Sequence, residues 1–133
     1  MEEIYKNAKP FVPPISEGIV VKVYDGDTIT IVSQLPYPSS PYYRFSVRLN
    51  GIDSAEIKGK TAVEKDLAKK ARDALNNKIL NRSVNLRNIE TEKYGRILAD
   101  VYLDGEWINE WMLKNGYAVA YDGGTKERPV EWD

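Results

Sequence analysis

Five charged residues lie in three separate places along the chain, and their side chains are of kinds that could act together on a phosphate. They are three acids and two arginines: Asp27, Asp53, Glu56, Arg48 and Arg96. Carboxylates can hold a hard divalent cation and position a water molecule. Guanidinium groups can bind a phosphate and offset the negative charge that grows while phosphorus is attacked. This set of residue types is what metal-assisted hydrolysis of a phosphodiester requires.

Each of these residues lies in a local sequence pattern. Residues 25–28 read Asp-Gly-Asp-Thr, in which Asp-Gly is a strong signal for a hairpin turn. Residues 48–56 read Arg-Leu-Asn-Gly-Ile-Asp-Ser-Ala-Glu, and residues 93–96 read Lys-Tyr-Gly-Arg. An Asp-Gly turn alone would indicate a plain hairpin. The acid that follows it, together with the two acids of the second pattern, favours a functional site.

The composition limits the chemistry that the chain can carry out. At 133 residues it is long enough for one domain with its own hydrophobic core. It contains no cysteine and no histidine, which excludes disulfides, thiolate zinc sites and a histidine base. Any catalysis must therefore use carboxylates, hydroxyls, amines or a metal-bound water. Ligands that are all oxygen atoms favour calcium, magnesium or manganese over zinc or copper.

Positive charge is concentrated in the middle of the chain. Residues 57–98 carry 11 Lys or Arg against 5 Asp or Glu, a net charge of +6, whereas the whole chain has a net charge of −1. A basic segment inside an acidic chain indicates a local polyanion site. For four of these cations the alternative is that they only solvate a helix: Lys65, Lys69, Lys70 and Arg72.

The ends of the chain give an expectation about location. Residues 1–14 lack the apolar run of a signal peptide, and no later stretch is apolar for long enough to span a membrane. We therefore expect a cytoplasmic protein without membrane contact, unless a leader has been removed. We also expect a monomer.

Hydrophobic periodicity predicts the elements that position the charged residues. Residues 1–17, with three prolines, predict an extended arm, and residues 19–24 and 28–32 predict the strands of the hairpin. Residues 43–49 alternate between apolar and polar, which predicts a strand that carries Arg48 on its polar face.

The second half of the chain predicts helices and two further strands. Thr-Ala-Val-Glu at residues 61–64 is a capping box that opens a helix to about residue 77. Its predicted buried stripe is Val63, Leu67, Ala71 and Leu75. The remaining predicted elements are strands at 84–89 and 97–103, a helix at 108–115 and a loosely held tail at 122–133.

This order of elements is compatible with a small closed barrel. Five short strands with a helix inserted after the third match an OB-fold. We therefore predict a mainly β fold with helices (α+β), built on a five-stranded OB-fold β-barrel. The predicted domain covers residues 18–121, between the arm at 1–17 and the tail at 122–133.

At these residues the chain resembles the staphylococcal nuclease (thermonuclease) family. The patterns at 25–28, 48–56 and 93–96, and a later Asp-Gly…Asn-Glu at 104–110, occur in the family's order and at similar separations. The resemblance implies the OB-fold barrel of that family and a calcium-dependent endonuclease. It implies cleavage of DNA and RNA to 3′-phosphate and 5′-hydroxyl products. The segment between Glu56 and the predicted helix, residues 57–60, is shorter than the loop that the family has there, and we therefore expect single strands to be preferred.

The resemblance also implies which residues would hold calcium. Asp27 and Asp53 resemble the calcium carboxylates of the family. The backbone carbonyl of Ser54 would be a further ligand, at a position where the family often has threonine. Asp25 resembles a carboxylate that lies beyond the direct ligands.

The catalytic and substrate-binding roles pass to matching residues in the same way. Glu56 resembles the residue that orients or deprotonates the attacking water, and the sequence leaves these two roles open. Arg48 and Arg96 resemble the arginines that bind the phosphate and its transition state. Three residues resemble contacts to the nucleotide: Lys93 and Tyr94 to its phosphate, and Tyr121 as an approximate match to an aromatic platform for the base.

Other interpretations of these segments are possible. Gly-Lys-Thr at 59–61 resembles the end of a phosphate-binding P-loop, but position 54 would have to be glycine and is serine, so no nucleotide cofactor is expected. Three tyrosines of the proline-rich loop at 33–43 could stack on bases or pack the hairpin: Tyr37, Tyr42 and Tyr43. The rival function is a non-catalytic OB-fold module that binds single-stranded nucleic acid or a protein. The presence of all three acids and both arginines argues against it.

Overall fold

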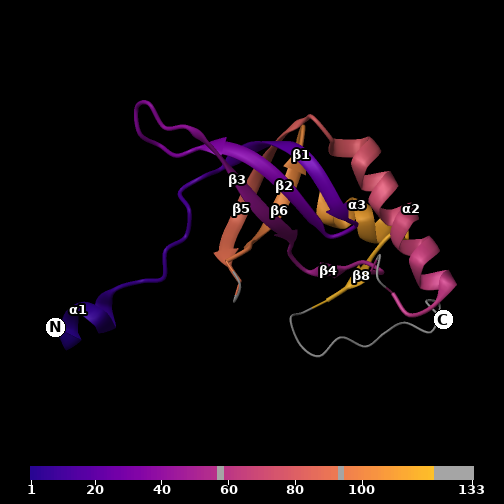
Figure 1. Cartoon of the computed structure of the whole chain (residues 1–133), viewed down its shortest axis with the longest axis horizontal. Coiled ribbons are helices and arrows are strands. Elements are labelled where there is room, and N and C mark those ends of the chain that lie inside the picture. The colour runs from indigo at the N-terminus through magenta and orange to yellow at the C-terminus, as the bar shows by residue number, and fades with distance from the viewer. Residues whose placement is uncertain (57–58, 93–94, 122–133) are drawn as a thin grey trace.

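Five long strands form a closed mixed β-barrel in the computed structural model, which describes residues 1–56, 59–92 and 95–121 (Figure 1). The barrel strands are β1 (Glu17–Asp25), β2 (Thr28–Gln34), β3 (Tyr42–Leu49), β5 (Ser83–Thr91) and β6 (Ile97–Leu103). Neighbouring strands pair in the order β3-β2-β1-β5-β6. The predicted hairpin at Asp25-Gly26 joins β1 to β2, with Asp25 opposite Thr28.

A parallel pairing between β3 and β6 closes the barrel. Val47 pairs with Ile97, Arg48 with Leu98 and Leu49 with Ala99. The predicted OB-type barrel with five strands is therefore confirmed. This closure sets the strand that carries Arg48 beside the strand that begins one residue after Arg96.

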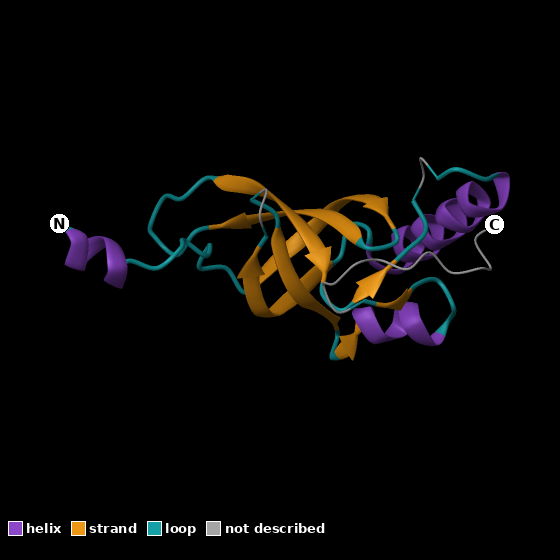
Figure 2. Ribbon diagram, turned by 90° about the horizontal axis from the view of Figure 1, so that it is seen from below, coloured by secondary structure: helices purple, strands orange, loops and turns teal. Residues whose placement is uncertain are grey.

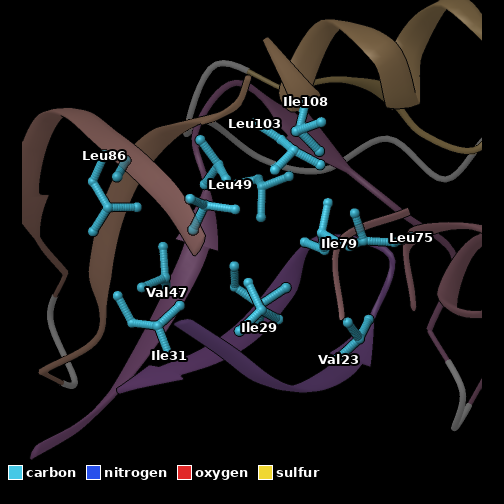
Figure 3. Close-up of a cluster of buried hydrophobic side chains, with 14 of the residues drawn as sticks. Val23, Ile29, Ile31, Val47, Leu49, Leu75, Ile79, Leu86, Leu103 and Ile108 are labelled. Atoms are coloured by element: carbon cyan, nitrogen blue, oxygen red, sulfur yellow. The ribbon is translucent and has the colours of Figure 1, made fainter. Parts of the chain in front are cut away.

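Apolar side chains from alternate positions of the strands fill the barrel (Figure 3). On β6 burial alternates along the whole strand, and on β3 it alternates at Val47, Arg48 and Leu49. Val47 and Leu49 are fully buried, so Arg48 lies on the opposite face, as the period-two pattern predicts.

Helix α2 (Ala62–Ile79) packs against β1 and contributes Leu75 and Ile79 to the same core (Figures 1 and 3). The predicted helix start is confirmed, because the Thr61 hydroxyl accepts a hydrogen bond from the Glu64 N–H at 3.0 Å. The helix continues two residues beyond its predicted end. The predicted stripe is partly wrong, because Val63 is 46% exposed and the buried residues are Glu64, Ala68, Ala71, Leu75 and Ile79.

Short elements fix the loop after β3. Strand β4 (Ile52–Asp53) pairs with β8 (Val119–Ala120), and β7 (Glu106–Trp107) leads into helix α3 (Ile108–Lys114). The side chain of Asn109 on α3 is buried and donates to the Asn50 carbonyl at 2.8 Å, while its Oδ1 accepts from the Val101 N–H at 2.9 Å. Asn109 therefore ties the start of the β3–β4 loop to β6.

The N-terminal segment projects away from the barrel, at the end opposite to α2 and α3 (Figure 2). Residues Glu2–Asn7 form a short helix, α1, where the sequence predicts an extended chain. Two glutamates in its first turn and Lys6 in its last turn complement the helix dipole, and none of its residues is buried. Among the described residues, no helix is both long and apolar enough to cross a membrane.

Candidate active site

A cavity of about 690 Å³ opens on the outer face of β1, β2 and β3, beside the β1–β2 turn and β4. Most of its charged lining comes from the residues singled out by the sequence: Asp25, Asp27, Arg48, Asp53, Glu56 and Arg96. Lys22 and Glu92 also line it. The fold thus brings together three sequence patterns that lie far apart in the chain.

Asp27 lies at the base of this cavity and is only 6% exposed. Its Oδ1 accepts a hydrogen bond from the Thr28 hydroxyl at 2.9 Å, and its Oδ2 accepts from the Ser54 N–H at 3.1 Å. Burial favours a raised pKa, but the hydrogen bonds from Asp25 and Ser54 and the charge of Arg48 outweigh it and lower the pKa of Asp27. Asp27 is therefore a carboxylate that stays ionised although it is buried.

Asp25 has the opposite character. Burial, with a hydrogen bond to Asp27 and repulsion from it, raises the pKa of Asp25 to about 8. Its Oδ1 also accepts the Asp27 N–H at 3.1 Å, which fixes the turn. At neutral pH the proton of this carboxyl pair therefore stays on Asp25, and Asp27 keeps its negative charge.

Arg48 lies between the two buried acids. Its Nη2 is 3.6 Å from Asp27 Oδ2 and 3.4 Å from Asp53 Oδ1. The guanidinium carbon is 5.3 Å from the centre of the Tyr121 ring, within the range of a cation–π contact. The side chain of Arg48 is only 12% exposed and lines the cavity, so these contacts hold it in place there.

Glu92 joins the two arginines and was not predicted from the sequence. Its Oε2 is 2.9 Å from Arg96 Nη2, and its Oε1 is 4.0 Å from Arg48 Nε. The backbones of Glu92 and Arg96 also pair, with the Glu92 N–H donating to the Arg96 carbonyl at 2.8 Å. The signal that could have found it is the acid four residues before Arg96, at the start of the same turn.

The remaining predicted site residues lie around this centre. Asp53 on β4 is 6% exposed, and Ser54 beside it is 1% exposed. Glu56 is exposed and lines the cavity, while its carbonyl accepts the Gly59 N–H at 2.9 Å. Lys93 and Tyr94 lie outside the described residues. The catalytic and binding roles of all these residues stay predictions.

The charges of the cavity suit a divalent cation. Among the described lining residues, five acids face three cations, so the cavity has an excess of negative charge even when Asp25 keeps its proton. A negatively charged phosphate can enter such a site only if positive charge accompanies it. The ligands that the cavity offers are oxygen atoms, which suit a hard cation. No three acids in the described parts of the chain converge closely enough to form a metal-binding cluster by themselves.

The basic helix predicted as a possible polyanion site does not take part. Lys65, Lys69, Lys70 and Arg72 are on α2, and none is among the described residues that line the cavity. Lys70 pairs with Asp66 at 3.0 Å, and both side chains are more than half exposed. The interpretation that these residues solvate a helix is therefore the better one.

Gly26 allows the turn to lie against helix α2. A Cβ atom at this position would be 2.8 Å from the Cβ atoms of both Ala71 and Ser54. We expect Gly26→Ala to lower the free energy of unfolding by about 1–3 kcal/mol in urea denaturation, because the turn has no room to move away. It should also displace Asp27 from the Ser54 N–H and reduce activity.

Gly105→Ala is the matched control for this prediction. Gly105 has φ +84° and no atom within 4 Å of an added Cβ, so its substitution strains only the turn between β6 and β7. It should lower stability but leave the cavity unchanged. A Gly26→Ala protein as stable as the unmodified chain would show that the turn is not confined by α2.

Comparisons with known proteins show what this chain is similar to. The family model described as "Staphylococcal nuclease homologue" matches residues 46–131. A thermonuclease from Staphylococcus hyicus is 35% identical over 104 residues, which are 76% of this chain and 57% of that protein.

Two further relatives extend the comparison. An uncharacterised endonuclease from Escherichia coli is 30% identical over 106 residues, 79% of this chain and 61% of its own length. The staphylococcal-like nuclease CAN1 from Arabidopsis thaliana is 35% identical over 82 residues, 59% of this chain and 24% of its own length. This chain thus spans from about a quarter to about three fifths of these relatives.

Proposed function

The chain belongs to the family of staphylococcal nuclease homologues, and on this premise we propose that it is a calcium-dependent nuclease that hydrolyses DNA and RNA. The observation that carries the proposal is that Arg48 Nη2 lies within 3.6 Å of carboxylate oxygens of both Asp27 and Asp53 at the base of one cavity. Glu56 and Arg96 line the same cavity. A module that only binds nucleic acid has no need for buried acids.

The two arginines bind the phosphate of the substrate. Arg48 is fixed by buried acids, and Arg96 is fixed by Glu92, so both guanidinium groups are oriented before the substrate arrives. Each can donate two parallel hydrogen bonds to phosphate oxygens, which a lysine cannot do. These donors act most strongly on the extra negative charge of the transition state.

The acids divide into two groups by their place in the cavity. Asp27 and Asp53 are buried and would hold calcium, with the Ser54 carbonyl as a further ligand. When bound, calcium offsets the phosphate charge so that an anionic nucleophile can approach. Glu56 is exposed at the cavity wall, where a water can reach it, and it would orient or deprotonate that water.

The direction of attack determines the products. We propose that water attacks phosphorus in line with the bond to the 5′ oxygen, so that this bond breaks. The phosphate stays on the 3′ side and the leaving oxygen becomes a 5′-hydroxyl. Because water is the nucleophile, the ribose 2′-hydroxyl is not needed and both DNA and RNA are substrates. The short segment 57–60 between Glu56 and α2 favours single strands.

End-group analysis of the fragments tests this proposal. Single-stranded DNA and RNA of the same sequence, incubated with the protein and calcium, should both give internal cuts with 3′-phosphate and 5′-hydroxyl ends. Glu56→Gln should give the same ends at a much lower rate, because it keeps the shape of the side chain but not its charge. Fragments with 5′-phosphate ends, or RNA cut through a 2′,3′-cyclic phosphate while DNA stays intact, would contradict the proposal.

A further inference from the structure

The cavity continues beyond the buried acids across the outer face of the barrel. Lys22 on β1 pairs with Thr30 on β2, and Thr30 pairs with Ser46 on β3, so the three form one row across the sheet. All three line the cavity. The row lies two residues along the strands from the pair Thr28 and Arg48, a separation of about 7 Å. Polar side chains therefore extend from the phosphate-binding arginine along the sheet.

Tyr24 stands at the β1 edge of this extension. Val23 pairs with Ile29 and Asp25 pairs with Thr28, so Tyr24 is the extra residue of a β-bulge. Bulges occur next to active sites, where they change the direction of a side chain. Tyr24 is 52% exposed and lines the cavity, with Lys22 Nζ 6.0 Å from the centre of its ring. An aromatic ring and a lysine are thus presented together beside the site.

The other tyrosines near the site are already engaged. The Tyr121 ring contacts the Arg48 guanidinium, and the backbone N–H of Tyr121 is bonded to the Gly51 carbonyl at 2.9 Å. The hydroxyls of Tyr37 and Tyr43 lie 3.3 Å apart at the end of the β2–β3 hairpin, and neither residue is among those that line the cavity. Tyr24 also has a cation beside its ring, but Lys22 Nζ is 6.0 Å away, at the outer limit of a cation–π contact, and Tyr24 is 52% exposed. Among the described residues, Tyr24 is therefore the aromatic residue best placed to meet a base in the cavity.

We propose that Tyr24 and Lys22 form a binding subsite for the nucleotide next to the cleaved phosphate, with the base stacked on the Tyr24 ring. This inference rests on the proposed nuclease function. Every base has a face that can stack on an aromatic ring, so the subsite accepts any sequence. Lys22 attracts the phosphate backbone, and the hydroxyls of Thr30 and Ser46 can bond to its sugar and phosphate oxygens.

The subsite selects an unpaired strand. In a duplex both faces of a base are covered by its neighbours, so the base must leave the stack before it can lie on Tyr24. A single strand offers its bases at much lower cost. The preference for single strands therefore has a source in the described part of the chain, independent of the segment at 57–60.

Dinucleotides with one cleavable phosphodiester test the subsite. Each is made with both bases, or with an abasic sugar on the 5′ or the 3′ side of the cleaved phosphate. For the unmodified protein, loss of the base on one side should lower kcat/KM by about tenfold, the size of one aromatic–base stack. Tyr24→Ala should already have this tenfold lower kcat/KM on the dinucleotide with both bases, and removal of a base should not lower it further. Tyr24→Phe keeps the aromatic ring and should behave as the unmodified protein does.

Tyr42→Ala is the matched control, because Tyr42 is 63% exposed on β3 and does not line this cavity. It should leave kcat/KM unchanged for all three substrates. The proposal is overturned if Tyr24→Ala cleaves the intact dinucleotide as fast as the unmodified protein and retains its sensitivity to base removal.

A second measurement separates this proposal from the nuclease function. If the unmodified protein hydrolyses neither the dinucleotides nor bis(p-nitrophenyl) phosphate, the proposed function fails. The subsite is then judged by the anisotropy of a fluorescent single-stranded decamer. A Kd raised about tenfold in Tyr24→Ala but not in Tyr42→Ala supports the subsite, and equal Kd values for all three proteins overturn it.

Discussion

Replacing Arg48 with lysine is expected to lower kcat by about 100- to 1000-fold, the usual effect of removing one donor to a transition-state oxyanion. Lysine keeps the positive charge between Asp27 and Asp53, so the buried acids remain compensated and the fold should survive. What is lost is the planar fork of donors, because the single nitrogen of lysine cannot bond to two phosphate oxygens in parallel as a guanidinium group can. Single-turnover cleavage of a labelled single strand measures the effect.

Arg44→Lys is the control for this substitution. Arg44 is on the same strand, is exposed and does not line the cavity. Its replacement makes the same chemical change and should alter turnover by less than about twofold, since exposed substitutions away from a site have small effects. Thermal unfolding of both variants checks that they are folded. Turnover of Arg48→Lys close to that of the unmodified chain would assign Arg48 to general electrostatics instead.

The residues that the sequence could identify are those whose signal is local. The Asp-Gly turn fixes the β1–β2 hairpin, and the alternation along β3 places Arg48 on the face opposite to that of its neighbours Val47 and Leu49. The capping box identifies the start of α2 because one hydrogen bond from Glu64 to Thr61 defines it. These features depend on neighbours within a few residues, so a short stretch of sequence contains them in full.

Which side of α2 faces the core could not be predicted, because a buried glutamate is part of that side. The rule that apolar residues face the core favoured Val63, but Glu64 is 4% exposed and its Oε2 accepts the Lys60 N–H at 3.1 Å. Gly59 makes room for it, since a Cβ there would be 2.5 Å from Glu64 Cδ. A buried carboxylate that bonds to the backbone overrides the pattern of apolar residues.

Glu92 and Tyr24 were missed for a different reason. Their surroundings are made by strand pairings that the sequence does not reveal. Glu92 reaches Arg48 only because β6 pairs in parallel with β3 and closes the barrel. Tyr24 is on the face opposite the buried Val23, as alternation predicts, but the cavity beside it is formed by side chains from β2, β3 and β4. Pairing partners are set by contacts between distant residues, so an alternating pattern alone could not show what lies beside either side chain.

Removing calcium is expected to abolish cleavage, and restoring it in excess over the chelator should return full activity. The reason is the excess of acids over cations in the cavity, which would repel a phosphate in the absence of a bound cation. Magnesium should support less activity, because it needs near-ideal octahedral geometry whereas calcium accepts irregular oxygen ligands. Undiminished cleavage in excess chelator would contradict the mechanism.

Metal binding can be measured without activity through the stability of the protein. Calcium at 100 times its Kd should raise the free energy of unfolding by about 2.7 kcal/mol. Asp27→Asn and Asp53→Asn should lose most of this gain, because each keeps the size of a buried side chain but not its charge. Asp66→Asn, in an exposed ion pair on α2, should keep the gain in full. An equal calcium-dependent rise in Tm for all four proteins would show that calcium binds elsewhere, since only a site built on Asp27 and Asp53 makes the stabilisation depend on these two acids.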